Sequence, residues 1–270
     1  MNKKTIACVV ARTVSTRLPL KVLRNVIDEY SMLDFMLQRL KLVKNIDDIY
    51  ICTSDEMVDD ILEDVAVKNK VKIYRGSPDA VIERLISVGN FENVDNVIRI
   101  TGDNVFTSYE YLEEQIKIHN QNELDYTRII NVPIGATAEV MKLEAVKECY
   151  DLIDPAISEY LLLYMFKPEH YKCGVIKLNE IPKSSNYTVT VDTKEDLNRT
   201  KNIFKYFKGN PLTIALKDII EIIDTHNIEN SKIEFAGNVK MPYGKEITFE
   251  EFQSDMNNRI NNSLQFTIGA

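Results

Sequence analysis

A cationic stretch near the start of the chain holds residue types that suit the binding of a small anion. The segment "ARTVSTRLPLKVL", residues 11–23, follows the apolar run "IACVV" and contains Arg12, Ser15, Arg17 and Lys21, but no glycine. Lysine offers phosphate oxygens a compact charge, and arginine offers them a bidentate one. Because the whole chain carries a formal net charge of -8, this local cluster favours a small anionic ligand.

Polar residues also follow three other apolar runs. Thr101, Gly102 and Asp103 follow "VIRI", Asp192 follows "YTVTV", and the Arg-Gly-Ser stretch 75–77 follows "VKIY". Mg²⁺ in proteins prefers one or two carboxylates together with phosphate oxygens. One cationic loop and two separated carboxylates therefore indicate a site for a phosphate-rich ligand with a divalent metal.

Each of these features also has a plain structural explanation. Cations in a loop commonly form a solvated face, and an aspartate after a strand commonly caps a turn or a helix. In "VDTKEDL", either Asp192 or Thr193 is a suitable cap for the helix that follows. The three histidines show no metal-ligand spacing, and no Ser-His-Asp or Cys-His constellation is legible.

The elements that would position these residues form an alternating series. Short, fully apolar runs alternate with segments of helical period, which is typical of a mainly parallel sheet with helices on both faces. In such sheets ligands bind beyond the carboxyl ends of the strands, where the polar residues above lie. Ser77 and Pro78 suit the N-cap and first position of a helix. The expected strands are 5–11, 48–54, 71–76, 96–103, 124–130, 174–178 and 186–193, and the expected helices are 32–43, 55–68, 77–89, one opening near Ser108, 142–151, 156–166, 194–207 and 212–224.

The chain has no internal repeat and no long linker, which predicts one domain over residues 1–225 and a C-terminal extension over 226–270. The extension is polar and rich in asparagine, and its segment 248–260 is either a last helix or a tail that contacts a partner.

Composition excludes several classes of protein. An acidic chain with a pI near 5.1 is a poor general binder of nucleic acid or anionic membranes. No apolar stretch approaches the roughly 20 residues of a membrane span, and the first apolar run is too short for a secretory signal. Cys8 and Cys52 lie in apolar runs and are expected to be buried free thiols. We therefore expect a cytoplasmic protein.

Taken together, the motifs resemble those of the cytidylyltransferase family. The pattern R-x-x-S-T-R-L-P-x-K after the first strand, "ITGD" after a central strand and "VDTxEDL" late in the chain are similar to its spore coat polysaccharide biosynthesis protein F type, which is related to the CMP-Kdo and CMP-sialic acid synthetases. "YRGSPDAVIERL" is similar to the "fRGsedDVLdRy" segment of that branch. The resemblance covers about residues 5 to 200.

The resemblance implies a Rossmann-like nucleotide-diphospho-sugar transferase fold of the glycosyltransferase-A type. It also implies Mg²⁺-dependent transfer of CMP from CTP to a small acceptor with release of pyrophosphate, in surface polysaccharide or glycoconjugate precursor synthesis. Related synthetases are often dimers, which makes a homodimer one candidate, and the sequence leaves the oligomeric state open. Carried over position by position, the residues with implied roles are Arg12, Ser15, Arg17 and Lys21 for the triphosphate, Ala11, Thr13, Ser77, Asp79 and Thr101 for the rest of the nucleotide, Glu139 for the acceptor, and Asp103 and Asp192 for Mg²⁺, with Lys21, Arg12 and Asp103 as the catalytic set.

The sequence also departs from the family pattern. The family loop reads R-M-G-S-T-R-L-P-G-K, and here Val14 and Leu20 replace its two glycines. On the acceptor side, Thr137 replaces an Asp of "GLDVE", and Ser158 and Tyr160 replace an Arg and a His. These changes favour an altered acceptor, or weaker activity, more than a lost nucleotide site. Two alternatives stay open: a transferase of the same fold that uses another NTP or a nucleotide sugar, and a non-catalytic nucleotide-binding protein.

Two expectations concern the loop itself. Val14 and Leu20 should either take an ordinary negative φ, leaving a wider loop, or turn away from the phosphates and narrow the pocket toward the acceptor. Lys21 should be a solvent-facing loop lysine whose removal barely changes thermal stability.

Overall fold

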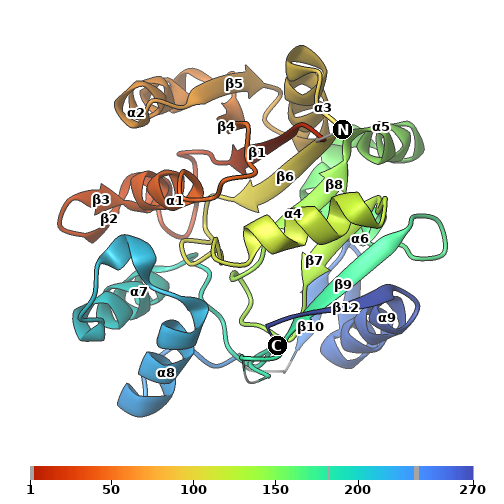
Figure 1. The fold of residues 1–270 in the computed structure, drawn as a ribbon. Helices are drawn as coiled ribbons and strands as arrows, with labels where there is room; N and C mark the ends of the chain where they lie inside the picture. The colour runs from red at the N-terminus through yellow and green to blue at the C-terminus, as the bar shows by residue number, and fades with distance from the viewer. Residues whose placement is uncertain (1–2, 182, 234–236, 270) are drawn as a thin grey trace.

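The fold is built on a mainly parallel sheet, which the computed structural model describes over residues 3–181, 183–233 and 237–269 (Figure 1). Within those ranges its eight strands lie in the order β12-β9-β7-β8-β6-β1-β4-β5, and β8 is antiparallel to both of its neighbours. The predicted α/β fold with a mainly parallel sheet is therefore confirmed. The strands are β1 (Thr5–Val10), β4 (Asp48–Ser54), β5 (Lys72–Gly76), β6 (Asn96–Thr101), β7 (Tyr126–Ile129), β8 (Glu139–Lys142), β9 (Cys173–Leu178) and β12 (Leu264–Ile268).

Helices cover both faces of the sheet because alternate side chains of each strand point to opposite faces. On β1, Ala7 and Val9 pack in one apolar cluster, and Ile6 and Cys8 pack in another. The first cluster includes α1 (Met32–Leu40), α2 (Ile61–Asn69) and α4 (Leu112–Gln121), and the second includes α3 (Val81–Glu92), α5 (Leu143–Leu152) and α6 (Leu161–Met165). A third cluster joins α1 to α7 (Lys194–Tyr206) and α8 (Leu216–His226).

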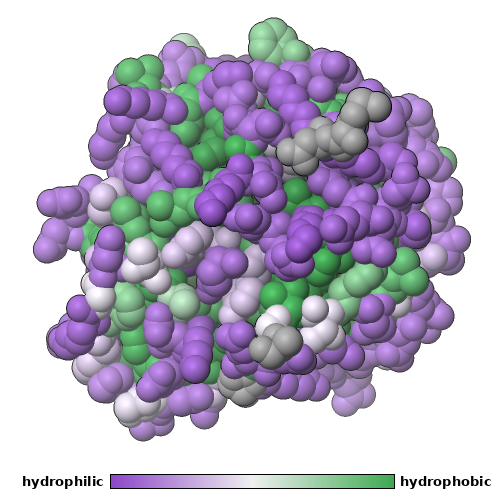
Figure 2. Space-filling model, viewed as in Figure 1, coloured by the Kyte–Doolittle hydropathy of each residue, from purple (hydrophilic) through white to green (hydrophobic). Residues whose placement is uncertain are grey.

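The surface seen in Figure 2 is mostly hydrophilic, with separate apolar areas between polar side chains. Cys8, Cys52, Cys149 and Cys173 are buried and free, as expected for the first two. Within the described ranges, none of the helices combines the length and the apolar character needed to cross a membrane.

The strand predicted over 186–193 is wrong. Only isolated bridges form there, at Tyr187 and Thr188. The alternation that predicted a strand is real, because Val189 and Val191 are fully buried in an apolar cluster. Their amides, however, donate to carbonyls of loops: Val189 to Ile134 and Val191 to Asp103.

The C-terminal segment contributes to the sheet. The helix predicted over 248–260 is confirmed as α9 (Phe249–Asn261), and β12 then pairs in parallel with β9, which the sequence did not reveal. Figure 1 shows α9 and β12 lying beside β9. Two short hairpins complete the described structure: β2 (Asn25–Ile27) with β3 (Tyr30–Ser31), and β10 (Asn238–Lys240) with β11 (Glu246–Thr248). Residues 234–236 and 270 of the expected extension lie outside the described residues.

Candidate active site

The loop after β1 is anchored by a buried carboxylate. Oδ1 of Asp59 accepts from the backbone amide of Thr13 at 2.7 Å and from its hydroxyl at 2.6 Å, and the other carboxylate oxygen accepts from Ser54. Burial alone would raise the pKa of Asp59, but the hydrogen bonds from Ser54 and Thr13 outweigh burial and lower it. Thr13 is itself buried, so its hydroxyl holds the loop in place at the carboxyl edge of the sheet.

Leu20 occupies a backbone conformation that suits glycine. Its φ is 57° and its ψ is 29°, in the left-handed region, directly before the 3₁₀ turn Lys21–Leu23. The expectation of an ordinary negative φ is therefore wrong for Leu20, while Val14 is not among the residues with positive φ. The tight turn needed to present Lys21 is kept without the glycine, at the cost of the steric conflict that a left-handed leucine carries. Both side chains are about half exposed, at 55% for Val14 and 49% for Leu20.

Exchanging each residue for glycine should therefore have opposite effects on stability. Leu20→Gly should keep or raise the free energy of unfolding, by up to about 1 kcal/mol, because relief of a left-handed leucine outweighs the freer unfolded chain. Val14→Gly gains no such relief and should lower it by about 0.5–1 kcal/mol. Urea unfolding of both variants provides the measurement. If both variants lost the same amount of unfolding free energy, the backbone of Leu20 would carry no strain.

Lys21 lies between the two predicted metal-binding carboxylates. Its Nζ is 3.2 Å from Oδ2 of Asp103 and 2.9 Å from Oδ1 of Asp192, and Nη2 of Arg17 is 3.1 Å from the same oxygen of Asp192. Burial would lower the pKa of Lys21, but the charges of Asp103 and Asp192 and their hydrogen bonds raise it above its usual value. The Lys21 side chain is 15% exposed, so the expectation of a solvent-facing lysine is wrong.

The structure decides which residue caps α7. Thr193 is the N-cap and forms a capping box with Asp196, while the carboxylate of Asp192 faces Lys21 and Arg17. Capping therefore explains Thr193 and leaves Asp192 available for a cation. The amide that brings Asp192 close to Asp103 belongs to Val191, which donates to the carbonyl of Asp103 at 2.9 Å.

The residues expected around the nucleoside meet at the neighbouring strand ends. Nη1 of Arg12 donates to the carbonyl of Pro78 at 3.2 Å, between the exposed residues Ser77 and Asp79. Ala11 lies against Gly102. A Cβ added to Gly102 would lie 3.0 Å from the Cβ of Ala11 and 3.1 Å from the Val10 carbonyl oxygen. Glycine therefore suits this close approach of β1 and β6, which a larger residue would have to widen. Thr101 of this set is half-buried and accepts from the side-chain amide of Asn104. Ser15, expected at the triphosphate, is also half-buried and accepts from the backbone amide of Leu18.

The prediction that Ser77 is the N-cap of the next helix is wrong. α3 begins at Val81 with Ala80 as its N-cap, and Ala80 has no side chain that can accept a hydrogen bond. Its place is taken by Ser158, far along the chain, whose hydroxyl accepts from the amide of Ile82 at 3.1 Å. Ser158 is one of the residues that depart from the family pattern, and the structure gives it this capping role.

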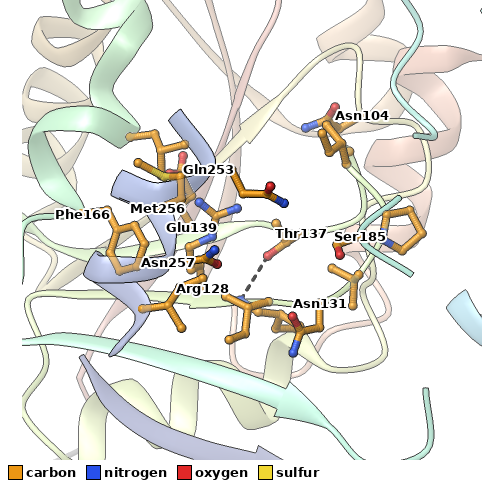
Figure 3. A pocket seen from close by; sticks show the side chains of 18 of the residues that line it. Asn104, Arg128, Asn131, Thr137, Glu139, Phe166, Ser185, Gln253, Met256 and Asn257 are labelled. Atoms are coloured by element: carbon orange, nitrogen blue, oxygen red, sulfur yellow. Dashed lines mark hydrogen bonds between the residues drawn. The ribbon is translucent and has the colours of Figure 1, made fainter. Parts of the chain in front are cut away.

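A pocket of about 400 Å³ opens beside Thr101 and Asn104 and runs along the ends of β6, β7 and β8 toward α9 (Figure 3). Figure 3 shows Arg128, Glu139 and Phe166 grouped near Met256 and Asn257 of α9, with Asn104 at the other end. Glu139, the residue expected at the acceptor, lines this pocket. Val14 and Leu20 do not line it, so neither of them narrows it.

Glu139 is buried between partners from the adjoining strands. Its Oε2 is 2.5 Å from Nη1 of Arg99 on β6, and its Oε1 accepts from the Tyr126 hydroxyl on β7 at 2.6 Å. Burial would raise the pKa of Glu139, but the charge of Arg99 and the other groups around it lower the pKa below the usual range for glutamate. Glu139 is therefore an ionised, fixed group rather than a proton donor at neutral pH.

Sequence reasoning missed two parts of this pocket, Arg128 and the inner face of α9. Arg128 lies within an expected strand and carries no motif, and α9 is separated from β7 by more than a hundred residues. Only the spacing of Phe249, Phe252, Met256 and Ile260, which puts them on one helix face, could have marked α9 as a wall.

Comparison with known proteins identifies the family once this geometry is known. The family model described as Cytidylyltransferase matches residues 6–167. This protein belongs to the cytidylyltransferase family. It is 31% identical over 221 residues, 79% of this chain and 91% of the relative, to spore coat polysaccharide biosynthesis protein SpsF of Bacillus subtilis (strain 168). The resemblance inferred from the motifs is thereby confirmed.

Solved structures agree with this cytidylyltransferase assignment. A cytidylyltransferase from Leptospira borgpetersenii serovar Hardjo-bovis (strain JB197) has a TM-score of 0.77 and 27% identity, covering 86% of this chain and 99% of its own. A CMP:2-keto-3-deoxy-manno-octonic acid synthetase complexed with CTP has a TM-score of 0.60 at 14% identity, covering 75% and 98%, and shows the shared nucleotidyltransferase fold.

Proposed function

We propose that this cytidylyltransferase transfers CMP from CTP to a hydroxyl group of a small acceptor, with release of pyrophosphate. We place the activity in the synthesis of a precursor for a surface polysaccharide or glycoconjugate, as the name of the Bacillus subtilis relative suggests. The observation that carries the proposal is the position of Lys21 between Asp103 and Asp192. This charge cluster lies at the strand ends beside the pocket that begins at Thr101 and Asn104.

The nucleotide is proposed to bind over the loop after β1. Arg12, Ser15, Arg17 and Lys21 hold the triphosphate, and the cations neutralise charge on the departing pyrophosphate. Ser77, Asp79 and Thr101 are proposed to surround the nucleoside, since Arg12 already reaches the 77–79 turn. Ala11 and Thr13 are buried, with the Thr13 hydroxyl bound to Asp59, and would support the loop beneath it. The Kdo synthetase of similar fold was solved with CTP, which supports CTP as the nucleotide here.

The two carboxylates fit a magnesium ion. Asp103 and Asp192 converge on a single cationic group, the Lys21 ammonium, so their arrangement suits a shared positive charge. Among the described residues, no group of three or more His, Cys, Asp or Glu is placed to hold a metal. Two carboxylates with phosphate oxygens and water are the set that Mg²⁺ prefers. When bound, Mg²⁺ would supply charge neutralisation at the phosphates.

The chain's own residues position the reaction. The acceptor hydroxyl oxygen forms a bond to the α-phosphorus, the bond from that phosphorus to the bridging oxygen breaks, and the electron pair leaves with pyrophosphate. The hydroxyl proton passes to water. The pocket brings the acceptor in line, which removes much of the entropic barrier, and Lys21 and Arg17 stabilise the leaving group.

Calorimetric titration of each NTP in the presence of Mg²⁺, with the variants Asp103→Asn and Asp192→Asn, tests this function. CTP should bind more tightly than the other nucleotides. Each variant should need a much higher Mg²⁺ concentration to reach the same CTP affinity, and the double variant should be far from additive because both acids serve one ion. Asp28→Asn, at an exposed hairpin position, is the matched control and should behave as wild type. Preference for another nucleotide, or an unchanged Mg²⁺ requirement in both variants, would contradict the proposal.

A further inference from the structure

Two arginines and one glutamate form a row across three strands at the floor of the pocket. Arg99 on β6 and Arg128 on β7 are both register partners of Glu139 on β8, so the three side chains share one face of the sheet. The oxygens of Glu139 are taken by Arg99 and by the Tyr126 hydroxyl. Within the described part of the chain, the Arg128 guanidinium has no hydrogen bond and no salt bridge, and its Nε is buried without a partner.

Arg128 is nevertheless held in place. Its Cζ lies 5.8 Å from the centroid of the Phe166 ring, and Phe166 stacks on Tyr126 with centroids 5.4 Å apart. Arg128 acts on Glu139 through its charge, but its partly buried guanidinium makes no hydrogen bond among the described residues, and N–H donors left without acceptors are costly for a folded protein. Because it lines the pocket, the missing partner is best supplied by a ligand, and a planar guanidinium matches the two oxygens of a carboxylate or phosphate.

The wall of the pocket that α9 forms has an apolar strip beside the polar side chains of Gln253 and Asn257. Phe252, Met256 and Ile260 of α9 line it at spacings of four residues, and Phe166 and Leu162 of the preceding region extend the same surface. A ligand with only hydroxyl groups would leave this surface without a complementary partner. α9 also lies outside residues 6–167, the part matched by the family model, so this wall is added by the C-terminal segment.

We propose that the acceptor is amphiphilic: it carries an oxyanion, either a carboxylate or a phosphate, that pairs with Arg128, and an apolar substituent that packs against α9. This proposal rests on the transferase function above and specifies the substrate class of the same site. The end of the pocket near Thr101 suits the reacting hydroxyl, because Oδ1 of Asn104 is buried there without a hydrogen-bond donor.

Ligand-observed NMR with small probes tests both halves of the proposal. Phenylacetate and phenyl phosphate combine an oxyanion with a ring, whereas benzyl alcohol lacks the anion, and acetate and inorganic phosphate lack the ring. The combined probes should bind at least about tenfold more tightly than the single-feature probes. Phenylacetate binding above phenyl phosphate, or the reverse, then distinguishes a carboxylate from a phosphate acceptor.

Variants locate the binding. Arg128→Met should weaken the combined probes by about 10- to 100-fold and leave benzyl alcohol unchanged, as expected for loss of a charge-assisted contact. Phe252→Ala should weaken the ring-bearing probes and leave acetate unchanged. Arg17→Met is the control for binding at the triphosphate loop. An equal loss in Arg17→Met and Arg128→Met, or no loss in Arg128→Met, would overturn the proposal.

Thermal stability provides a second readout. If Arg128 is a ligand-binding residue, Arg128→Met should change the Tm little, because the removal of buried N–H donors without acceptors offsets the lost attraction to Glu139. A marked fall in Tm would instead assign Arg128 a structural role on Phe166. CTP binding, measured in parallel, separates the two proposals. If the wild-type protein binds CTP but not the combined probes, only the proposed acceptor class is refuted. If the wild-type protein binds no CTP, the transferase function is refuted.

Discussion

Replacing Lys21 by alanine should lower kcat/KM for pyrophosphate release by roughly 10²-fold or more, the scale of losing one charge-stabilising group. Lys21 is the cation held between Asp103 and Asp192, where the leaving phosphates are proposed to lie. CTP affinity should fall as well, which calorimetry measures without any acceptor. Arg24→Ala is the matched control, because Arg24 is an exposed cation whose side chain, among the described residues, donates only to the Pro19 carbonyl.

The same variant should bind Mg²⁺ more tightly in the absence of nucleotide. Removing the ammonium group leaves two carboxylates facing each other, with Arg17 beside only one of them, and their mutual repulsion favours a divalent ion. Stability should fall by only about 1 kcal/mol or less at low Mg²⁺, since both acids are partly exposed. If the Lys21→Ala variant kept wild-type turnover and an unchanged Mg²⁺ affinity, Lys21 would have no role in the proposed site.

Much of the fold could be predicted from the sequence because its strands are local, apolar and separated by helical segments. The failures are of a different kind. β8 spans only Glu139–Lys142 and runs antiparallel between β6 and β7, so its four residues gave no periodic signal. β12 forms a strand because its backbone pairs in parallel with β9, and this pairing leaves no signal in the local sequence. Residues 186–193 alternate as a strand does, yet their hydrogen-bond partners are loops that no local pattern reveals.

The convergence of the residues predicted to bind the nucleotide could be foreseen because they follow strand ends, and parallel strands bring those ends to one edge. The pairing of Lys21 with two carboxylates was not predictable, since it depends on the Val191 amide docking on the Asp103 carbonyl. Most of the pocket proposed for the acceptor could not be predicted, for the same reason. It needs Arg128 in the middle of a strand and a helix more than a hundred residues later to meet across one cavity.

Replacing Arg99 by methionine should cost about 3 kcal/mol of the free energy of unfolding at pH 7, as expected when one partner of a buried ion pair is removed. Glu139, 8% exposed, would lose the guanidinium 2.5 Å away and keep only Tyr126 as a hydrogen-bond donor. Arg128, its other register neighbour, limits the loss, so the double variant Arg99→Met/Arg128→Met should lose more. Urea unfolding measures each difference.

The pH dependence of that loss identifies Glu139 as its origin. In the wild type the pKa of Glu139 is lowered by the charge of Arg99, which offsets burial, so its contribution to stability is present above the unfolded pKa and is lost as the pH falls. Without Arg99, burial raises the folded pKa, and the penalty shrinks as the pH falls from 7 toward the unfolded value of about 4.3. The variant should therefore recover stability relative to wild type between pH 7 and pH 5. Arg99→Met/Glu139→Gln, which leaves no buried carboxylate, should be more stable than Arg99→Met at pH 7 and show no such recovery. A loss that is constant with pH, or unrelieved by Glu139→Gln, would place the effect in side-chain packing instead.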